Sequence, residues 1–167
     1  MLYNRGMNEQ LLQPYRFTLA YTESLMEGVS EEEMLLQPSD GVNPPAWLIG
    51  HLAVVNDMAL GMLGAQGVCP AGWGELFGPG SSASVDPQAC PSREELMTAL
   101  RDSHAAVCAA VETADLSQLT DPNPIGPLVK SFPTLGDLVG HILTTHPASH
   151  LGHLSNWRRQ TGRPPIF

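Results

Sequence analysis

Three histidines lie close together near the end of the chain, at positions 146, 150 and 153. Residues three and four apart lie on the same face of a helix, so a helical segment would present His146, His150 and His153 as one row. Neutral imidazole is the commonest protein ligand for transition metals and is available at neutral pH. The spacing therefore predicts half of a metal site, and the other half must come from another helix.

His51 is the candidate for the missing ligand, because it falls on the apolar face of a predicted helix. A lone histidine on such a face is more often a hydrogen-bonded core residue than a metal ligand. With six histidines in 167 residues, a single pair at a spacing of four is also weak evidence. Two interpretations remain open: a metal centre built from two helices, or histidines at the surface and core edge that bond to backbone or water.

The elements that must position these side chains are four helical segments with an apolar repeat near 3.6 residues. Capping boxes at Ser30/Glu33 and Ser92/Glu95 predict a short extra turn over 30–37 and the start of the third segment. Prolines suit the first position of the second segment, and Thr134 caps the fourth. The expected segments are 9–28 or 14–28, 44–64, 92–113 and 134–162.

Pro147 lies inside the fourth segment, directly after the first clustered histidine. It removes one backbone hydrogen bond, so we expect either a kink or two shorter helices that meet there. Residues 65–91 and 114–133 are rich in turn-forming residues and predict two long irregular connections. In the first, Trp73 and Phe77 are expected to anchor the loop to the bundle, with a lid role as the alternative.

Composition excludes several classes of protein. Eight basic and seventeen acidic residues give a net charge of -9, which argues against non-specific binding to nucleic acid or anionic membrane. No apolar run approaches the length of a membrane span, and the N-terminus lacks the features of a secretory signal, so we expect a cytoplasmic protein. Cys69, Cys90 and Cys108 are few and scattered, which indicates reduced thiols, with Cys108 as a small core residue. His104 is also expected to be structural.

Two motifs together resemble a known family. The first is Pro45-x-Trp47-Leu48-Ile49-Gly50-His51-Leu52, and the second is His146-x-x-x-His150-Leu151-Gly152 followed by Leu154, Trp157, Arg158 and Arg159. They are similar to motifs of the DinB-like (DinB/YfiT-like) superfamily of metal-binding four-helix bundles. The resemblance implies an all-α, up-down-down-up four-helix bundle with a long crossover connection, and we expect residues 1–167 to form one such domain.

The resemblance also implies a function. The family's metal ligands map onto His51, His146 and His150, which would hold a divalent metal, zinc or nickel, with positions open to water or substrate as in a catalytic site. Some relatives are transferases that use low-molecular-weight thiols. The implied activity is thus metal-dependent transfer of such a thiol to a small molecule, or hydrolysis. The alternative is a non-catalytic metal- or small-ligand-binding stress protein. A homodimer is also implied.

His153 departs from the family, which commonly has glutamine at that position. It could act as a fourth ligand, as a hydrogen-bond partner of a ligand, or as the general base, and we assign it the catalytic role. Asn56 and Asp57 could orient a ligand, but solvation at the helix surface is favoured. Arg158 and Arg159 could bind a carboxylate, but interaction with the helix macrodipole is favoured.

Overall fold

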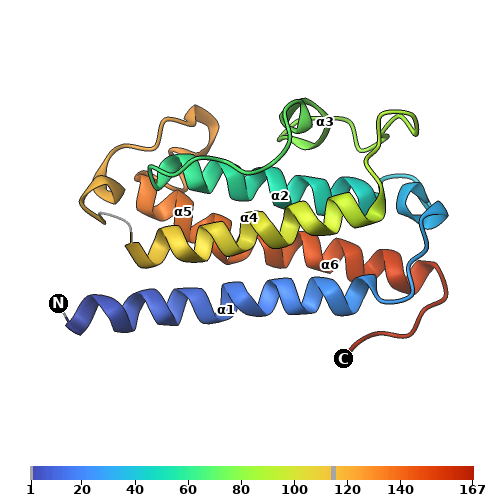
Figure 1. The fold of residues 1–167 in the computed structure, drawn as a ribbon, viewed down its shortest axis with the longest axis horizontal. Helices are drawn as coiled ribbons and strands as arrows, with labels where there is room; N and C mark the ends of the chain where they lie inside the picture. The colour runs from blue at the N-terminus through green and yellow to red at the C-terminus, as the bar shows by residue number, and fades with distance from the viewer. Residues whose placement is uncertain (1, 114–115) are drawn as a thin grey trace.

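Four long helical columns lie side by side, and two irregular connections cover one side of them (Figure 1). The structure is a computed structural model that describes residues 2–113 and 116–167. The first three columns are α1 (Leu2–Met26), α2 (Pro45–Met62) and α4 (Arg93–Thr113), and the last joins α5 (Leu135–Leu143) to α6 (Thr145–Gln160). The short elements are α3 (Trp73–Phe77) and the 3₁₀ turns η1 (Glu32–Leu35), η2 (Leu116–Thr120) and η3 (Gly126–Leu128).

The columns alternate in the order that the sequence predicted. In Figure 1, α1 runs one way, α2 and α4 run back, and α5 with α6 runs in the first direction again. Because α2 and α4 are parallel, the chain must cross the length of the bundle between them, and the connection that carries α3 does so. An all-α, up-down-down-up bundle is confirmed. Met1 and residues 114–115, the latter at the start of the predicted second connection, lie outside the described residues.

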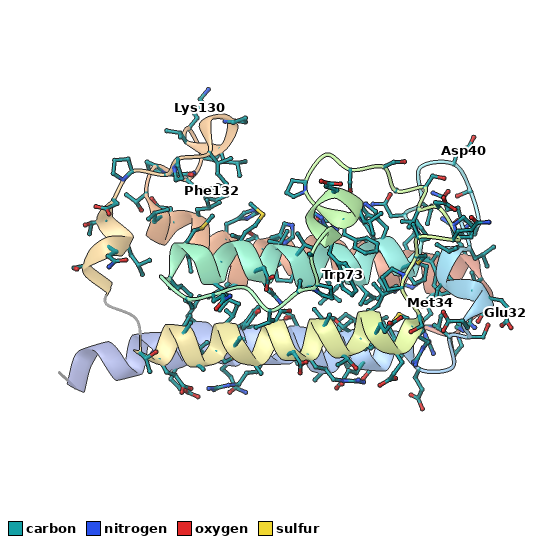
Figure 2. The ribbon with its side chains drawn as sticks, turned by 45° about the horizontal axis from the view of Figure 1, so that its top comes forward. Glu32, Met34, Asp40, Trp73, Lys130 and Phe132 are labelled. Carbon is teal, nitrogen blue, oxygen red and sulfur yellow. The ribbon has the colours of Figure 1, made fainter. Side chains whose placement is uncertain are left out.

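Helix α2 is buried on nearly all sides, although the sequence predicted a single apolar face. Fourteen of its eighteen residues are buried, because α4 and the last column cover two sides and α3 covers a third. Figure 2 shows Trp73 where this connection meets the bundle, whereas Lys130 and Phe132 mark the second connection at one end. Within residues 2–113 and 116–167, no helix combines the length and apolarity that a bilayer crossing requires.

Two apolar clusters fill the bundle, one towards each end. One contains Trp47 and Val54 of α2 together with Leu151 of α6, and the other contains Val55 of α2 and Leu143 of α5. The boundary between the clusters thus falls between positions 54 and 55 on α2 and between 143 and 151 on the last column. Polar side chains gather near this boundary: His51, Asn56, Ser103, His104, His146 and His150.

Capping boxes fix where two helices begin, as predicted. The Ser92 amide donates to Glu95 (2.8 Å), and the Glu95 amide donates to the Ser92 hydroxyl (3.3 Å). Thr134 and Asp137 make the same reciprocal pair at the start of α5. At Ser30 only half of the box forms, because the Ser30 hydroxyl donates to Glu32 instead. There the chain makes the short turn η1 and no longer helix.

The predicted start of the first helix, at residue 9 or 14, is wrong. Helix α1 begins at Leu2 and continues through Pro14. A proline inside a helix removes one backbone hydrogen bond but does not prevent the turns on either side from forming. The sequence pattern treated Pro14 as a residue of the first turn, whereas in the structure it lies in the middle of the helix.

The predicted fourth helix is two helices. Thr144 has φ −129° and ψ −79°, which is not helical, and it separates α5 from α6. The Thr144 hydroxyl donates to the Gly140 carbonyl (2.6 Å), which satisfies one carbonyl at the end of α5. Pro147 is the third residue of α6, within the first turn, where a missing N–H costs no helical bond. Of the two alternatives, two shorter helices are confirmed.

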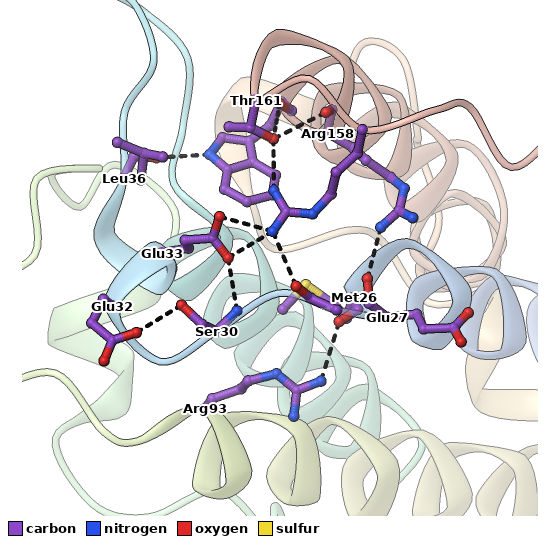
Figure 3. A network of polar contacts seen from close by, with 12 residues as sticks. Met26, Glu27, Ser30, Glu32, Glu33, Leu36, Arg93, Arg158 and Thr161 are labelled. Carbon is purple, nitrogen blue, oxygen red and sulfur yellow. Dashed lines mark hydrogen bonds and ion pairs between the residues drawn. The ribbon is translucent and has the colours of Figure 1, made fainter.

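Arg158 and Arg163 join the ends of α1, η1 and α6 in one polar network (Figure 3). The buried Arg158 guanidinium donates to the carbonyls of Leu25 (3.0 Å) and Glu27 (2.9 Å). Arg163 donates to both carboxylate oxygens of Glu33, at 2.8 and 2.7 Å. Because the last carbonyls of a helix lack partners within it, Arg158 closes the C-terminal end of α1.

Candidate metal centre

Three imidazoles from two helices meet in the middle of the bundle. The Nε2 atom of His146 lies 3.1 Å from Nε2 of His51 and 3.2 Å from Nε2 of His150. His51 is buried, and the other two are half-buried. Within the described part of the chain, these are the residues whose ligand atoms group closely enough to hold one metal ion. The three predicted ligands are therefore brought together.

The local sequence explains why α6 contributes two of these side chains. His146 and His150 are one turn apart on the same helix, and both face α2. The break at Thr144 places His146 in the first turn of a new helix, where Pro147 also fits. The spacing of four, which was weak evidence alone, becomes functional because α2 brings His51 opposite the pair.

The crossing connection sets the orientation of His51. Its Nδ1 lies 2.7 Å from the carbonyl oxygen of Phe77 in α3. A carbonyl only accepts, so Nδ1 carries the hydrogen and Nε2 presents its lone pair to the other histidines. Phe77 comes this close because position 50 is glycine: a Cβ there would lie 2.5–2.7 Å from the Phe77 ring.

Trp47 supports the same ring from one turn earlier in α2. Its indole stacks on the His51 imidazole, with ring centroids 4.5 Å apart and planes 9° from parallel. The indole N–H donates to the hydroxyl of Ser81 in the crossing connection (2.9 Å). His51 is thus fixed by a hydrogen bond to the backbone and by a packed aromatic ring. Such partners orient a ligand before any ion arrives.

The electrostatics of the cluster favour neutral imidazole. Burial and then the neighbouring histidines lower the pKa of His146 to about 4 and that of His150 to about 3. Burial also lowers the pKa of His51, although the Phe77 carbonyl opposes that shift. At neutral pH the three rings are therefore uncharged, which is the form in which imidazole binds metals.

The hydrogen bonds of the cluster fit a cation better than they fit protons alone. Nε2 of His51 has no hydrogen, and Nε2 of His146 contacts both it and Nε2 of His150. One hydrogen on His146 cannot make a linear bond to both neighbours, so at least one nitrogen–nitrogen contact is poorly satisfied. A single cation accepts all three lone pairs at once. The donor set, three imidazole nitrogens, suits zinc, nickel or copper.

The other nitrogen of His150 supports the same conclusion. Nδ1 of His150 is buried and has no hydrogen-bond partner among the described residues. If Nε2 supplies the lone pair to an ion, Nδ1 carries the hydrogen, and metal-bound histidines usually donate that hydrogen to a carbonyl, a carboxylate or water. His51 already has such a partner in Phe77.

His153 lies next to the cluster and outside it. Its side chain is exposed, and its ring meets the ring of His150 edge-on, with centroids 5.8 Å apart. It does not belong to the group of nitrogens that could share one ion. Of the roles considered for His153, the structure gives no support to a fourth ligand, and the assigned role of acid or base remains a prediction.

His141 is a neighbour of the site that sequence reasoning missed. Its ring meets His146 edge-on at 5.7 Å and stacks on Phe132 of the second connection at 4.3 Å. Its Nδ1 lies 2.5 Å from the Thr145 hydroxyl. In one continuous helix, a spacing of five would place His141 and His146 on different faces, so only the break at Thr144 brings them together.

Asn56 and Asp57 are not solvated surface residues, so the favoured interpretation of them was wrong. Asn56 is buried, accepts from the Tyr15 hydroxyl (2.8 Å) and donates to Ser103 (3.1 Å). The Asp57 carboxylate accepts the amides of Val68 and Cys69, which pins the start of the crossing connection. Neither residue contacts the three histidines, so an orienting role is not seen either.

The arginines near the C-terminus are structural, and the thiols are unpaired. Arg158 closes the end of α1, as described above, and Arg159 is exposed. None of Cys69, Cys90 and Cys108 forms a disulfide, as predicted. Trp73 and Phe77 are both buried, so they anchor the crossing connection.

Comparison with known proteins identifies the family. The sequence model described as the DinB superfamily matches residues 15–154, a range that contains His51, His146 and His150. This chain belongs to the DinB superfamily. The resemblance drawn from the two histidine motifs is thus confirmed, together with the helical fold that it implied.

Solved structures include a similar fold with little sequence likeness. A protein from Streptococcus pneumoniae, whose crystal structure was determined by a structural genomics consortium, superposes with a TM-score of 0.61. It is 15% identical and covers 91% of this chain, which covers 90% of that one. At that identity the comparison speaks for the DinB-type fold alone. A search of curated proteins finds no match.

Proposed function

We propose that this DinB-superfamily protein is a metal-dependent enzyme for a small-molecule substrate. His51, His146 and His150 hold a divalent ion, zinc or nickel, and the reaction is transfer of a low-molecular-weight thiol or hydrolysis. The observation that carries the proposal is the convergence of three neutral imidazole nitrogens on one point, with His51 oriented by the Phe77 carbonyl. When bound, the ion would serve as a Lewis acid that makes a nucleophile available at neutral pH.

The surrounding residues have distinct roles in this proposal. Trp47 and Phe77 hold His51 and keep water from the inner side of the cluster, since both are buried. His153 lies at the outer side, exposed to solvent and beside His150, where it can exchange protons with substrate and water. Histidine is the commonest general acid or base in enzymes. Three protein ligands leave positions open for substrate, as catalytic zinc sites do.

Metal analysis of protein purified anaerobically tests the first step. We expect about one zinc or nickel per chain in the wild type and in a His153→Ala variant, and less than about 0.3 in His150→Ala. The His153→Ala variant is the matched control, because it removes the neighbouring imidazole from the same helix. A wild-type protein with little metal, or equal metal in His150→Ala, would remove the basis of the proposal.

Activity is the second step. The metal-loaded protein is assayed with a panel of low-molecular-weight thiols combined with alkyl and epoxide electrophiles, and with ester and amide substrates. We expect turnover in the wild type and a loss of at least about a hundredfold in His153→Ala with its metal retained. Retained activity in that variant would contradict the role given to His153.

The alternative is a non-catalytic protein that uses the same site to bind a metal or a small ligand during stress. It predicts metal without turnover on either panel. Cobalt substitution separates the two further, because the absorption spectrum distinguishes a closed tetrahedral site from one that admits added thiol or water. The enzyme requires a spectrum that changes when thiol is added. The homodimer remains a prediction, which light scattering of the metal-loaded protein would test.

A further inference from the structure

The three cysteines of the chain lie in different electrostatic surroundings. Burial and then the Asp57 carboxylate raise the pKa of Cys69 to about 12. Burial and then the Glu31 carboxylate raise the pKa of Cys90. A thiolate is the reactive form of cysteine, and a neighbouring carboxylate works against it. Neither of these two thiols is placed to react.

Cys108 differs because a base and a cation lie beside it. Its Sγ lies 3.9 Å from Nδ1 of His104, one turn earlier in α4. Burial raises the pKa of Cys108, but the Arg16 guanidinium lowers it. Arg16, on α1, also pairs with the carboxylates of Glu9 (2.8 Å) and Glu112 (2.9 Å), which oppose its effect on the thiol and hold it at the seam between the helices.

The hydrogen bonds of His104 determine which of its nitrogens can accept a proton. Nε2 lies 2.9 Å from the carbonyl oxygen of Tyr15, and a carbonyl only accepts, so Nε2 carries the hydrogen. Nδ1 therefore presents its lone pair to Cys108. The ring is held in place by stacking on Tyr15, with centroids 4.0 Å apart and planes 12° from parallel. Burial lowers the pKa of His104, which keeps the ring neutral at pH 7.

A nucleophile, a base and a group that orients the base are thus present at one place, well away in the sequence from the three-histidine cluster. We propose that Cys108 is a site of oxidation by small hydroperoxides, with His104 as the base and Arg16 as the cation beside the thiolate. The site is partly exposed, and a hydroperoxide is small enough to reach a half-buried sulfur.

The reaction balances with hydrogen peroxide as the oxidant. His104 Nδ1 takes the thiol proton, and the Cys108 sulfur attacks one oxygen of the peroxide. A sulfur–oxygen bond forms, the oxygen–oxygen bond breaks, and the leaving hydroxide takes the proton back from His104. The products are the sulfenic acid of Cys108 and water, so the sulfur loses two electrons and the peroxide gains them.

Trapping of the sulfenic acid tests the proposal. The full-length protein is treated with hydrogen peroxide in the presence of dimedone, and the three cysteine peptides are followed by mass spectrometry. We expect Cys108 to be labelled at least about ten times faster than Cys69 or Cys90, as the contrast in thiolate stabilisation requires. Equal labelling of the three, or preferential labelling of either other cysteine, would overturn the proposal.

Two variants test the assigned roles independently. His104→Gln removes the base yet can still donate to the Tyr15 carbonyl, and Arg16→Gln removes the cation. Each should slow labelling of Cys108 about tenfold or more. Arg101→Gln is the control, because it removes another ion pair between α4 and α1, with Glu23, and should leave the rate unchanged. If His104→Gln fails to fold, Arg16→Gln still decides. Unchanged labelling of Cys108 in every folded variant would contradict the mechanism.

Discussion

The three imidazoles of the candidate centre resist protonation, and the stability of the metal-free protein should show it. In the unfolded chain these histidines take up protons near pH 6.5, whereas burial lowers the pKa of His146 to about 4 and of His150 to about 3. Between those values the unfolded state binds more protons. The free energy of unfolding should therefore be unaffected by these groups above about pH 7.5 and fall as the pH drops from 6.5 towards 4.

Urea unfolding of the metal-free protein at several pH values measures this effect. A variant in which His146 and His150 are both replaced by Gln provides the control, because it lacks the two titrating groups with the largest shifts. We expect its stability to depend less steeply on pH over the same interval. An identical pH profile in the two proteins would contradict the lowered pKa values.

The contact between Gly50 and Phe77 is a second feature at the scale of single residues. A methyl group at position 50 would overlap the Phe77 ring, so Gly50→Ala should destabilise the protein by about 1–3 kcal/mol and weaken metal binding by displacing the His51 acceptor. Gly61→Ala in the same helix meets nothing within 4 Å. It should be neutral or stabilise by up to about 1 kcal/mol. Thermal melts and metal titrations of both variants measure the difference, and equal effects would refute the steric argument.

At the scale of helices, the end of α1 depends on a side chain from α6. Arg158→Ala would leave the carbonyls of Leu25 and Glu27 without this donor, and we expect a loss of about 2–3 kcal/mol in the free energy of unfolding. Arg159→Ala is the matched control, because the next residue is exposed and should change stability by less than about 0.5 kcal/mol. Chemical denaturation of both variants compares them directly. A similar loss in both would mean that Arg158 acts only through its charge.

The helices differ in how much of them the sequence revealed. Local signals were reliable: the Ser92 and Thr134 caps and the prolines at 44 and 45 mark helix starts that depend on neighbouring residues alone. The start of α1 was missed, because Pro14 by itself does not tell an interior position from a first turn. The exact point at which the last column divides was also missed, because Thr144 carries no strong breaking signal.

The candidate centre shows the same division. The spacing of His146 and His150 was visible, and family resemblance supplied His51. The Phe77 carbonyl and the proximity of His141 could not be predicted, because each depends on where a distant connection or a helix break places an atom. Likewise, Asn56 was read as exposed because the burial of α2 on several sides arises from the crossing connection, which has no periodic pattern.

For the whole molecule, an ion bound to two columns should stabilise the fold by mass action. His51 comes from α2 and the other two ligands from α6, so binding requires the folded bundle. Free metal at a hundred times its dissociation constant adds about 2.7 kcal/mol, which corresponds to a rise of about 5–10 °C in melting temperature for a chain of this size. Differential scanning calorimetry with added zinc or nickel, and then with a chelator, measures the shift. His150→Ala should show no shift, and a wild type indifferent to both treatments would exclude a site of this kind.

The carbonyl that aligns His51 belongs to a five-residue helix held on the bundle by two aromatic side chains. Lifting that helix away would free the imidazole to rotate and would remove one of the constraints that prepare it for an ion. Opening of the crossing connection and release of the metal are therefore linked events: a loaded protein should protect residues 73–77 from proteases, and cleavage there should loosen the grip on the ion.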